Sequence, residues 1–257
     1  MAFFESSNPT LSDKVFNKNR SQYVDIDNVM TVRGTMNKFG FLMLMVLGAA
    51  AYTWQLFSQN NPSLMTTLMW VGVIGGLVVG VTMSFKPQWS NFLAPVYAIL
   101  EGFFVGALSV VLNEAFAEKF PGLIMSAVGL TIAVAIAMFL LYNFRIIQPT
   151  QRFKSIIFSA TLGIGIFYLI SIALGFFGVN MPFMNFGDGS LLGIGISLFI
   201  VAIAALNLIL DFERIEVGAD NGAPKYMEWY SAFGLLVTII WLYIEILRLL
   251  SRFSSKN

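Results

Sequence analysis

The chain has 257 residues, 57% of them hydrophobic and only 11% charged, whereas roughly a quarter of the residues in soluble domains are charged. A soluble fold could not bury so much apolar surface, so the composition predicts a membrane protein of one domain. Cysteine and histidine are both absent, which excludes disulfides, most zinc sites, His-assisted serine catalysis and a histidine pH switch. The net charge of +1 gives no indication of a nucleic-acid partner.

Residues 1–38 are polar and predict a cytoplasmic N-terminal arm rather than a cleavable signal peptide. Seven apolar runs follow, each long enough for a membrane-spanning helix and separated by Pro, Gly or Asn. Backbone groups must find their hydrogen bonds within each segment in lipid, so the predicted fold class is all-α. We expect a seven-helix transmembrane domain over 39–250 and a short polar tail at 251–257, with spans at 39–57, 67–85, 92–112, 123–144, 156–177, 191–210 and 230–250.

The basic residues are sorted between alternate loops. Only Lys119 lies in the loops on the side opposite the arm, and the positive-inside rule therefore predicts a cytoplasmic N-terminus. Seven spans would place the tail outside, although three basic residues near the C-terminus argue for the other side. The residues expected inside are Lys14, Lys18, Arg20, Arg33, Lys38, Lys86, Arg145, Arg152, Lys154, Arg214 and Lys225, and the three near the C-terminus are Arg248, Arg252 and Lys256.

Glycines recur at four-residue spacing in three of the runs. Small residues at this spacing let helices approach closely in lipid, where hydrophobic association is absent. We therefore assign them to helix packing and not to a ligand site. They are Gly72, Gly76 and Gly80, then Gly102 and Gly106, then Gly189 and Gly193.

Three acidic residues, Glu101, Asp211 and Glu245, lie within the apolar runs or at their margins. A charge near the bilayer centre is unfavourable by about 2.5 to 3.5 kcal/mol on insertion scales, so such residues usually face a protein interior or a water-filled path. Asp211 and Glu245 are each followed three residues later by an arginine, Arg214 and Arg248. Each of these two acids could therefore belong to a local ion pair instead.

Glu101 has no basic residue within a helical turn. It is therefore either protonated or served by a group on another helix. Lys86 ends the second run, where a lysine that extends to the membrane interface is the simplest interpretation.

The segments that carry these acids have a recognisable pattern. They are Ala94-Pro95-Val96-Tyr97 followed by Glu101-Gly102, then Leu210-Asp211-Phe212, then Tyr243-Ile244-Glu245. Together with the seven-span layout, they resemble the Bax inhibitor-1 family, and in particular its bacterial YccA-type branch, over nearly all of 33–250.

The resemblance implies a multi-pass protein of the bacterial inner membrane that is not an enzyme and leaks calcium in a proton-sensitive way. In that family two acids of the sixth and seventh helices share a hydrogen bond in the closed state, and by position these are Asp211 and Glu245. Lys86 falls where a latch to the sixth-helix acid is found, and Arg214 and Arg248 are the local partners. Full ionisation of the pair would create a transient calcium site of hard oxygen ligands. No resident cofactor is implied, and the lipid bilayer, calcium ions and protons are the expected partners.

Two features depart from the family pattern. Glu245 stands where aspartate is common, and the link between the two acids is longer, with a polar stretch over 216–229. Unless residues 224–229 lie along the membrane surface, Glu245 would sit farther from the cytoplasmic face than Asp211. A shared hydrogen bond requires oxygens closer than about 3 Å.

Two other functions remain open. YccA-type relatives are linked to a membrane-bound quality-control protease through a cytoplasmic tail, and the arm at 1–38 fits that role. An intramembrane aspartyl protease is disfavoured, because Glu245 has bulky neighbours and the Gly187-Asp188-Gly189 run lies in a loop.

Overall fold

The computed structural model describes residues 29–179 and 185–256, and the regular structure of these residues is helical. Within these residues, seven α-helices are long and apolar enough to cross a membrane, which confirms the predicted fold class and number of spans. They are α2 (Val32–Ser58), α3 (Pro62–Phe85), α4 (Ser90–Phe116), α5 (Leu123–Asn143), α6 (Gln151–Phe176), α7 (Leu191–Asp220) and α8 (Met227–Lys256), with a short 3-10 helix, η3 (Pro87–Trp89), before α4.

Polar caps begin several of these helices at the turn signals of the sequence. The Thr31 hydroxyl accepts a hydrogen bond from the Gly34 amide at 2.9 Å and thereby caps α2. Asn61 caps α3 by accepting from the Leu64 amide, with Pro62 in the first helical position. The caps satisfy backbone donors that the first turn leaves unpaired.

The helices extend beyond the apolar runs that predicted them. The first helix begins inside the polar arm of 1–38, the sixth span continues to Asp220 instead of ending near 210, and the last helix runs through the predicted polar tail to Lys256. Hydropathy detects the part of a helix that lies in lipid, whereas helical hydrogen bonding continues through polar residues until a turn interrupts it.

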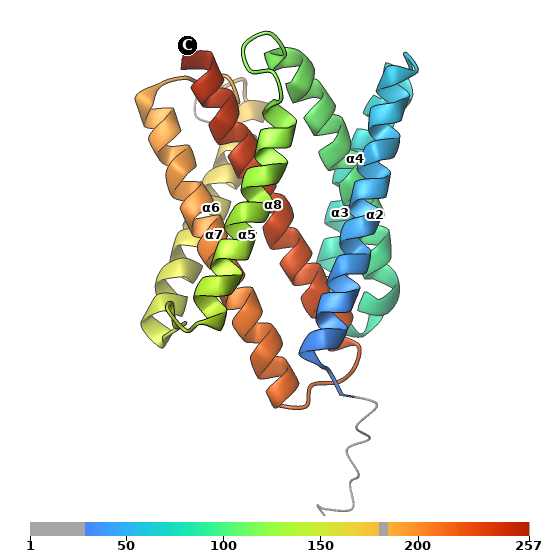
Figure 1. The fold of residues 1–257 in the computed structure, drawn as a ribbon. Coiled ribbons are helices and arrows are strands. Elements are labelled where there is room, and N and C mark those ends of the chain that lie inside the picture. The colour runs from blue at the N-terminus through green and yellow to red at the C-terminus, as the bar shows by residue number, and fades with distance from the viewer. Residues whose placement is uncertain (1–28, 180–184, 257) are drawn as a thin grey trace, which may run out of the picture.

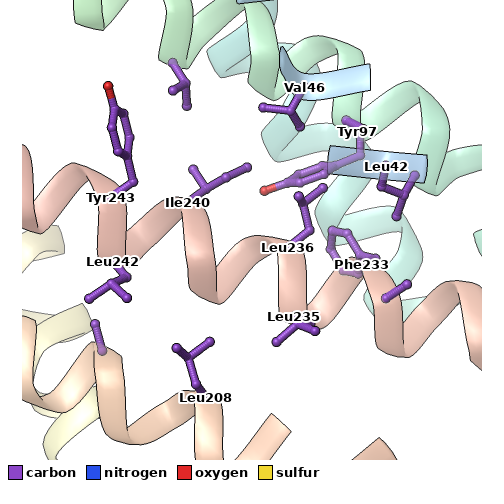
Figure 2. Close-up of a cluster of buried hydrophobic side chains, with 14 of the residues drawn as sticks. Leu42, Val46, Tyr97, Leu208, Phe233, Leu235, Leu236, Ile240, Leu242 and Tyr243 are labelled. Atoms are coloured by element: carbon purple, nitrogen blue, oxygen red, sulfur yellow. The ribbon is translucent and has the colours of Figure 1, made fainter. Parts of the chain in front are cut away.

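The helix α8 lies at the centre of the bundle (Figure 1), where it packs against α2, α4, α5 and α7. Figure 2 shows that it presents two apolar faces. Leu235 and Leu242, two turns apart, point toward Leu208 of α7, and Leu236 and Ile240 point to the opposite side, toward α2 and α4. Because α8 is enclosed in this way, polar side chains on it meet other helices rather than lipid.

Glycines allow the α2–α3–α4 group to pack closely. A Cβ atom at Gly72 would lie 2.5 Å from the Leu100 carbonyl oxygen of α4, and one at Gly102 would lie 2.5 Å from the Val46 carbonyl oxygen of α2. Both distances are far shorter than van der Waals contact, so a larger side chain would separate the backbones. The packing role that the sequence suggested for these two glycines is confirmed.

The two ends of the bundle differ in what they hold. The start of α2 and the link between α7 and α8 lie at one end, here called the link end, and the C-terminus lies at the other (Figure 1). The Ser90 hydroxyl at the start of α4 donates a hydrogen bond to the Tyr226 carbonyl at 2.9 Å, which ties the link to a third helix.

Candidate functional site

A cavity of about 650 Å³ lies between α3, α4, α7 and α8, with α6 at its border. Its walls are mostly apolar, but several polar side chains line it. Two of the three acids singled out in the sequence, Glu101 and Asp211, are among them, together with Ser84, Tyr97, Thr161, Asn207, Arg214 and Thr238. The cavity therefore combines two carboxyl groups from different helices in the interior of a bundle whose outer surface is apolar.

Asp211 connects α7 to α8. Its Oδ2 atom accepts a hydrogen bond from the Thr238 hydroxyl at 2.5 Å, and its Oδ1 atom lies 3.6 Å from a guanidinium nitrogen of Arg214. The Asp211 side chain is only 11% exposed, whereas that of Arg214 is 71% exposed. The local ion pair that the spacing allowed is thus present, but its basic partner is largely solvated and leaves one side of the carboxylate facing the cavity.

Glu101 reaches the same cavity from α4. Tyr97, one helical turn earlier, interacts with the Glu101 carboxyl group, and within the described residues Glu101 takes part in no ion pair. Gly76 of α3 faces it, since a Cβ atom there would lie 3.3 Å from Glu101 Oε1. The absence of a side chain at Gly76 leaves room for the carboxyl group.

A second polar contact borders the cavity on α6. The Asn207 side-chain amide of α7 donates hydrogen bonds to the Thr161 hydroxyl at 2.8 Å and to the Ile203 carbonyl at 2.9 Å. Neither Asn207 nor Thr161 was singled out in the sequence, because uncharged polar residues are frequent in membrane helices. Asn207 stands one helical turn before Asp211, and that spacing was the available signal.

Glu245 lies outside the cavity in a sealed cluster with α6. Its side chain is 1% exposed, and both carboxylate oxygens accept hydrogen bonds from Arg248, at 3.0 and 3.1 Å. The Tyr168 hydroxyl of α6 donates to Glu245 Oε1 at 2.6 Å. The guanidinium group of Arg248 lies 5.2 Å from the Tyr168 ring centroid and 5.0 Å from that of Phe186. Of the two interpretations of Glu245, the buried local ion pair is the one present here.

Asp211 and Glu245 are therefore placed in separate groups. Asp211 of α7 bonds to Thr238 of α8. Glu245 lies seven residues beyond Thr238, which corresponds to a rise of about 10 Å along the axis of α8. The hydrogen bond expected between the two acids is not among those that the described residues form, and the two carboxylates do not converge on one calcium site in this conformation. The cause is that α7 and α8 both continue to the link end with few residues between them. The extended link over 216–229 is thus mostly helix, and Glu245 lies deeper from that end than Asp211.

The latch residues have different surroundings. Lys86 points its ammonium group toward Trp89, 6.0 Å from the ring centroid, and the ion pairs of the described residues do not include it. Arg214 occupies the position beside Asp211 that the family pattern suggested for Lys86. Arg248 pairs with Glu245.

Glu228 is a buried acid that the sequence interpretation assigned to the polar link. Its side chain is completely buried, and its Oε1 atom accepts hydrogen bonds from the amide and the hydroxyl of Thr31, both at 2.9 Å. Lys38 of α2 bonds to Oε2, and the Lys225 ammonium group lies 3.1 Å from Oε1. Thr31 and Lys38 are far from Glu228 along the chain, so local spacing could have indicated only the pair with Lys225 and not the rest of this cluster, which we call the Glu228 clasp.

The acidic side chains are too dispersed for a tight metal site. Within 29–179 and 185–256, no group of three or more acidic side chains gathers closely enough to hold a metal ion. The cavity offers two carboxylates and several hydroxyl groups, a set of hard oxygens that suits weak and transient cation contacts rather than a tight site.

The fold and the site define a polytopic helical membrane protein with buried carboxyl groups beside a cavity between α3, α4, α7 and α8. A family model described as Bax inhibitor 1 like matches residues 8–255, and the chain belongs to this family. It is thus a multi-pass integral membrane protein of a family whose members are generally not enzymes. No curated protein and no solved structure matches the chain.

Proposed function

We propose that the protein is a proton-sensitive leak for cations, with calcium as the expected ion, and that Glu101 and Asp211 line its path. The observation that carries this proposal is that both carboxyl groups, from α4 and α7, border one cavity of about 650 Å³. Buried acids in membrane helices usually mark an ion or proton path. This proposal moves the pair from Asp211 and Glu245, which the family pattern suggested, to Asp211 and Glu101.

The net charge of the cavity depends on the protonation of a few side chains. The titratable side chains that line it are Tyr97, Glu101, Asp211 and Arg214. With both acids ionised, two negative charges face one positive charge, and a cation is attracted into the cavity. Protonation of either acid removes the net negative charge, so the proposed leak falls as the pH is lowered.

The far side of the path is closed in this conformation, on our proposal, by the cluster of Glu245, Arg248 and Tyr168. These side chains connect α8 to α6 beyond Trp241, which still borders the cavity. An ion that passed this point would have to separate a buried ion pair, which is strongly unfavourable. Opening therefore requires α6 and α8 to move relative to each other.

The orientation of the leak follows from the basic loops. The link end carries most of the basic loop residues, so we place it in the cytoplasm, with the arm beside it, in the bacterial inner membrane. The cavity then communicates with the cytoplasmic side near Ser84 and Arg214, both of which are exposed.

The direct test is calcium flux into proteoliposomes over a range of pH. We expect flux in the native protein to decrease at low pH, and the double variant Glu101→Gln/Asp211→Asn to lose this dependence. Glu213→Gln is the matched control, because Glu213 is an acid of α7 that pairs with Lys154 and does not line the cavity. A pH profile of the double variant that is the same as the native profile would contradict the proposal.

A second function, regulation of a membrane-bound quality-control protease through the arm, is favoured by the Glu228 clasp. The Met30 amide donates a hydrogen bond to the Ala223 carbonyl at 2.7 Å, and Val29 pairs with Pro224. A partner that pulled on the arm would therefore act directly on the link before α8. Residues 1–28 of the arm lie outside the described residues. Deletion of 1–28 would abolish protease engagement and leave flux intact if regulation is the arm's only role, whereas a joint loss would connect the two functions.

A further inference from the structure

The cavity is larger than an inorganic ion requires. Calcium takes six to eight oxygen ligands, and a water occupies about 30 Å³ in the liquid, so a fully hydrated ion needs about 240 Å³. The cavity holds about 650 Å³, which is within the range of roughly 300 to 1,000 Å³ typical of small-molecule sites. Size alone thus leaves room for an organic body beside the carboxylates.

The chemistry of the walls is that of a site for organic cations. Phe104, Phe233 and Trp241 line the cavity together with Tyr97, whose ring lies 4.7 Å from that of Phe233 in an edge-to-face arrangement. Aromatic faces attract cations through their quadrupole, and more strongly where water is excluded. The carboxylates add Coulomb attraction, and the one basic residue of the lining, Arg214, is mostly exposed.

One wall of the cavity faces the membrane. Leu77 and Val81 of α3 line the cavity and are 67% and 51% exposed, and Gly76 and Gly80 on the same helix add no side chain to the wall. The helix α3 packs mainly against α4. A molecule with an apolar body can therefore reach the carboxylates from the lipid side of α3 as well as from the link end.

We propose that this cavity binds organic cations with an apolar body, such as hydrophobic ammonium or phosphonium ions, with the positive centre between Glu101 and Asp211 and the apolar groups against Phe104, Phe233 and Trp241. The inference rests on the same cavity as the proposed leak and adds a ligand class to it. A bound organic cation occupies the place of the permeating ion and blocks the leak.

The experiment uses radiolabelled tetraphenylphosphonium and the full-length protein in nanodiscs, with empty nanodiscs to subtract partition into lipid. We expect saturable binding that weakens by about tenfold or more, at least about 1.4 kcal/mol, in Glu101→Gln/Asp211→Asn. Glu213→Gln should bind like the native protein. Triphenylphosphine oxide, a neutral molecule of similar apolar character, should compete poorly.

The side-chain changes in the double variant preserve shape, and the amide oxygen that Asp211→Asn introduces can still accept from Thr238, so a folded variant is expected; its thermal unfolding profile checks this. Binding no greater than in empty nanodiscs, or equal binding in the double variant and the native protein, would overturn the inference. Calcium flux measured on the same protein preparations, reconstituted into liposomes, separates the two proposals. Flux without phosphonium binding would leave the leak intact and reject the ligand, whereas binding without flux would reject the leak alone.

Discussion

Two acid–arginine pairs in this protein have the same sequence spacing and opposite surroundings. Asp211 and Arg214 on α7, and Glu245 and Arg248 on α8, are both i,i+3 pairs. Arg214 is 71% exposed and leaves Asp211 beside a cavity, whereas Arg248 is 10% exposed and holds both oxygens of a sealed Glu245. The difference indicates that local spacing predicts the pair but not its role, which depends on what the neighbouring helices place around it.

The largest effect is expected from breaking the sealed pair. Arg248→Met leaves the Glu245 carboxylate buried without its cation, and removal of one partner of a buried pair typically destabilises by about 3 to 5 kcal/mol. Thermal unfolding in detergent should show a large loss of stability.

The double variant Glu245→Gln/Arg248→Met should recover much of that stability, because no buried charge remains unpaired. If the single variant unfolds like the native protein, Glu245 is not sealed as described.

A second prediction separates the two acids by function. Asp211→Asn should reduce calcium flux at neutral pH by about tenfold, or about 1.4 kcal/mol in the barrier, because the cavity loses one of its two negative charges. The Glu245→Gln/Arg248→Met variant should keep the pH dependence of flux, whatever its absolute rate. If Asp211→Asn left calcium flux unchanged and Glu245→Gln/Arg248→Met abolished its pH dependence, the proton-sensing role would belong to Glu245 instead.

A smaller effect is expected from the hydrogen bond that holds Asp211 to α8. Thr238→Val removes the donor and keeps the shape, and loss of such a bond typically destabilises by about 1 to 3 kcal/mol when the acceptor is charged. Chemical denaturation in mild detergent would measure it, with Thr66→Val as the control, since Thr66 is exposed and its hydroxyl donates to the Pro62 carbonyl of its own helix.

The smallest effect on stability is expected from Arg214→Gln, since exposed ion pairs contribute about 0 to 1 kcal/mol. Its effect on flux should be an increase at low ionic strength, because a positive charge leaves the cavity mouth, and the increase should disappear in high salt. A decrease in flux would show that Arg214 serves the path rather than opposing it.

The sequence predicted well which segments are helical, and poorly which side chains contact one another between helices. Apolar runs identify spans because lipid admits no unpaired backbone groups, but the ends of α7 and α8 are polar, so the runs stopped short of Asp220 and Lys256. The acids stood out for the same physical reason. Their pairing did not, because it depends on relative depth along two helices. Glu228 was overlooked because its partners Thr31 and Lys38 are far from it along the chain, although Lys225 stands three residues before it.

The central claim is that the cavity admits water-borne cations and that Glu101 and Asp211 set its preference. The native chain has no cysteine, so Val237→Cys on the cavity wall can be labelled alone, with the buried Leu242→Cys as control. Methanethiosulfonate reagents of opposite charge report on both points. The account predicts that the cationic reagent reacts faster than the anionic one, relative to a free thiol, and that Glu101→Gln/Asp211→Asn removes the preference. Equal relative rates in the native background, or no reaction at Val237→Cys, would contradict it.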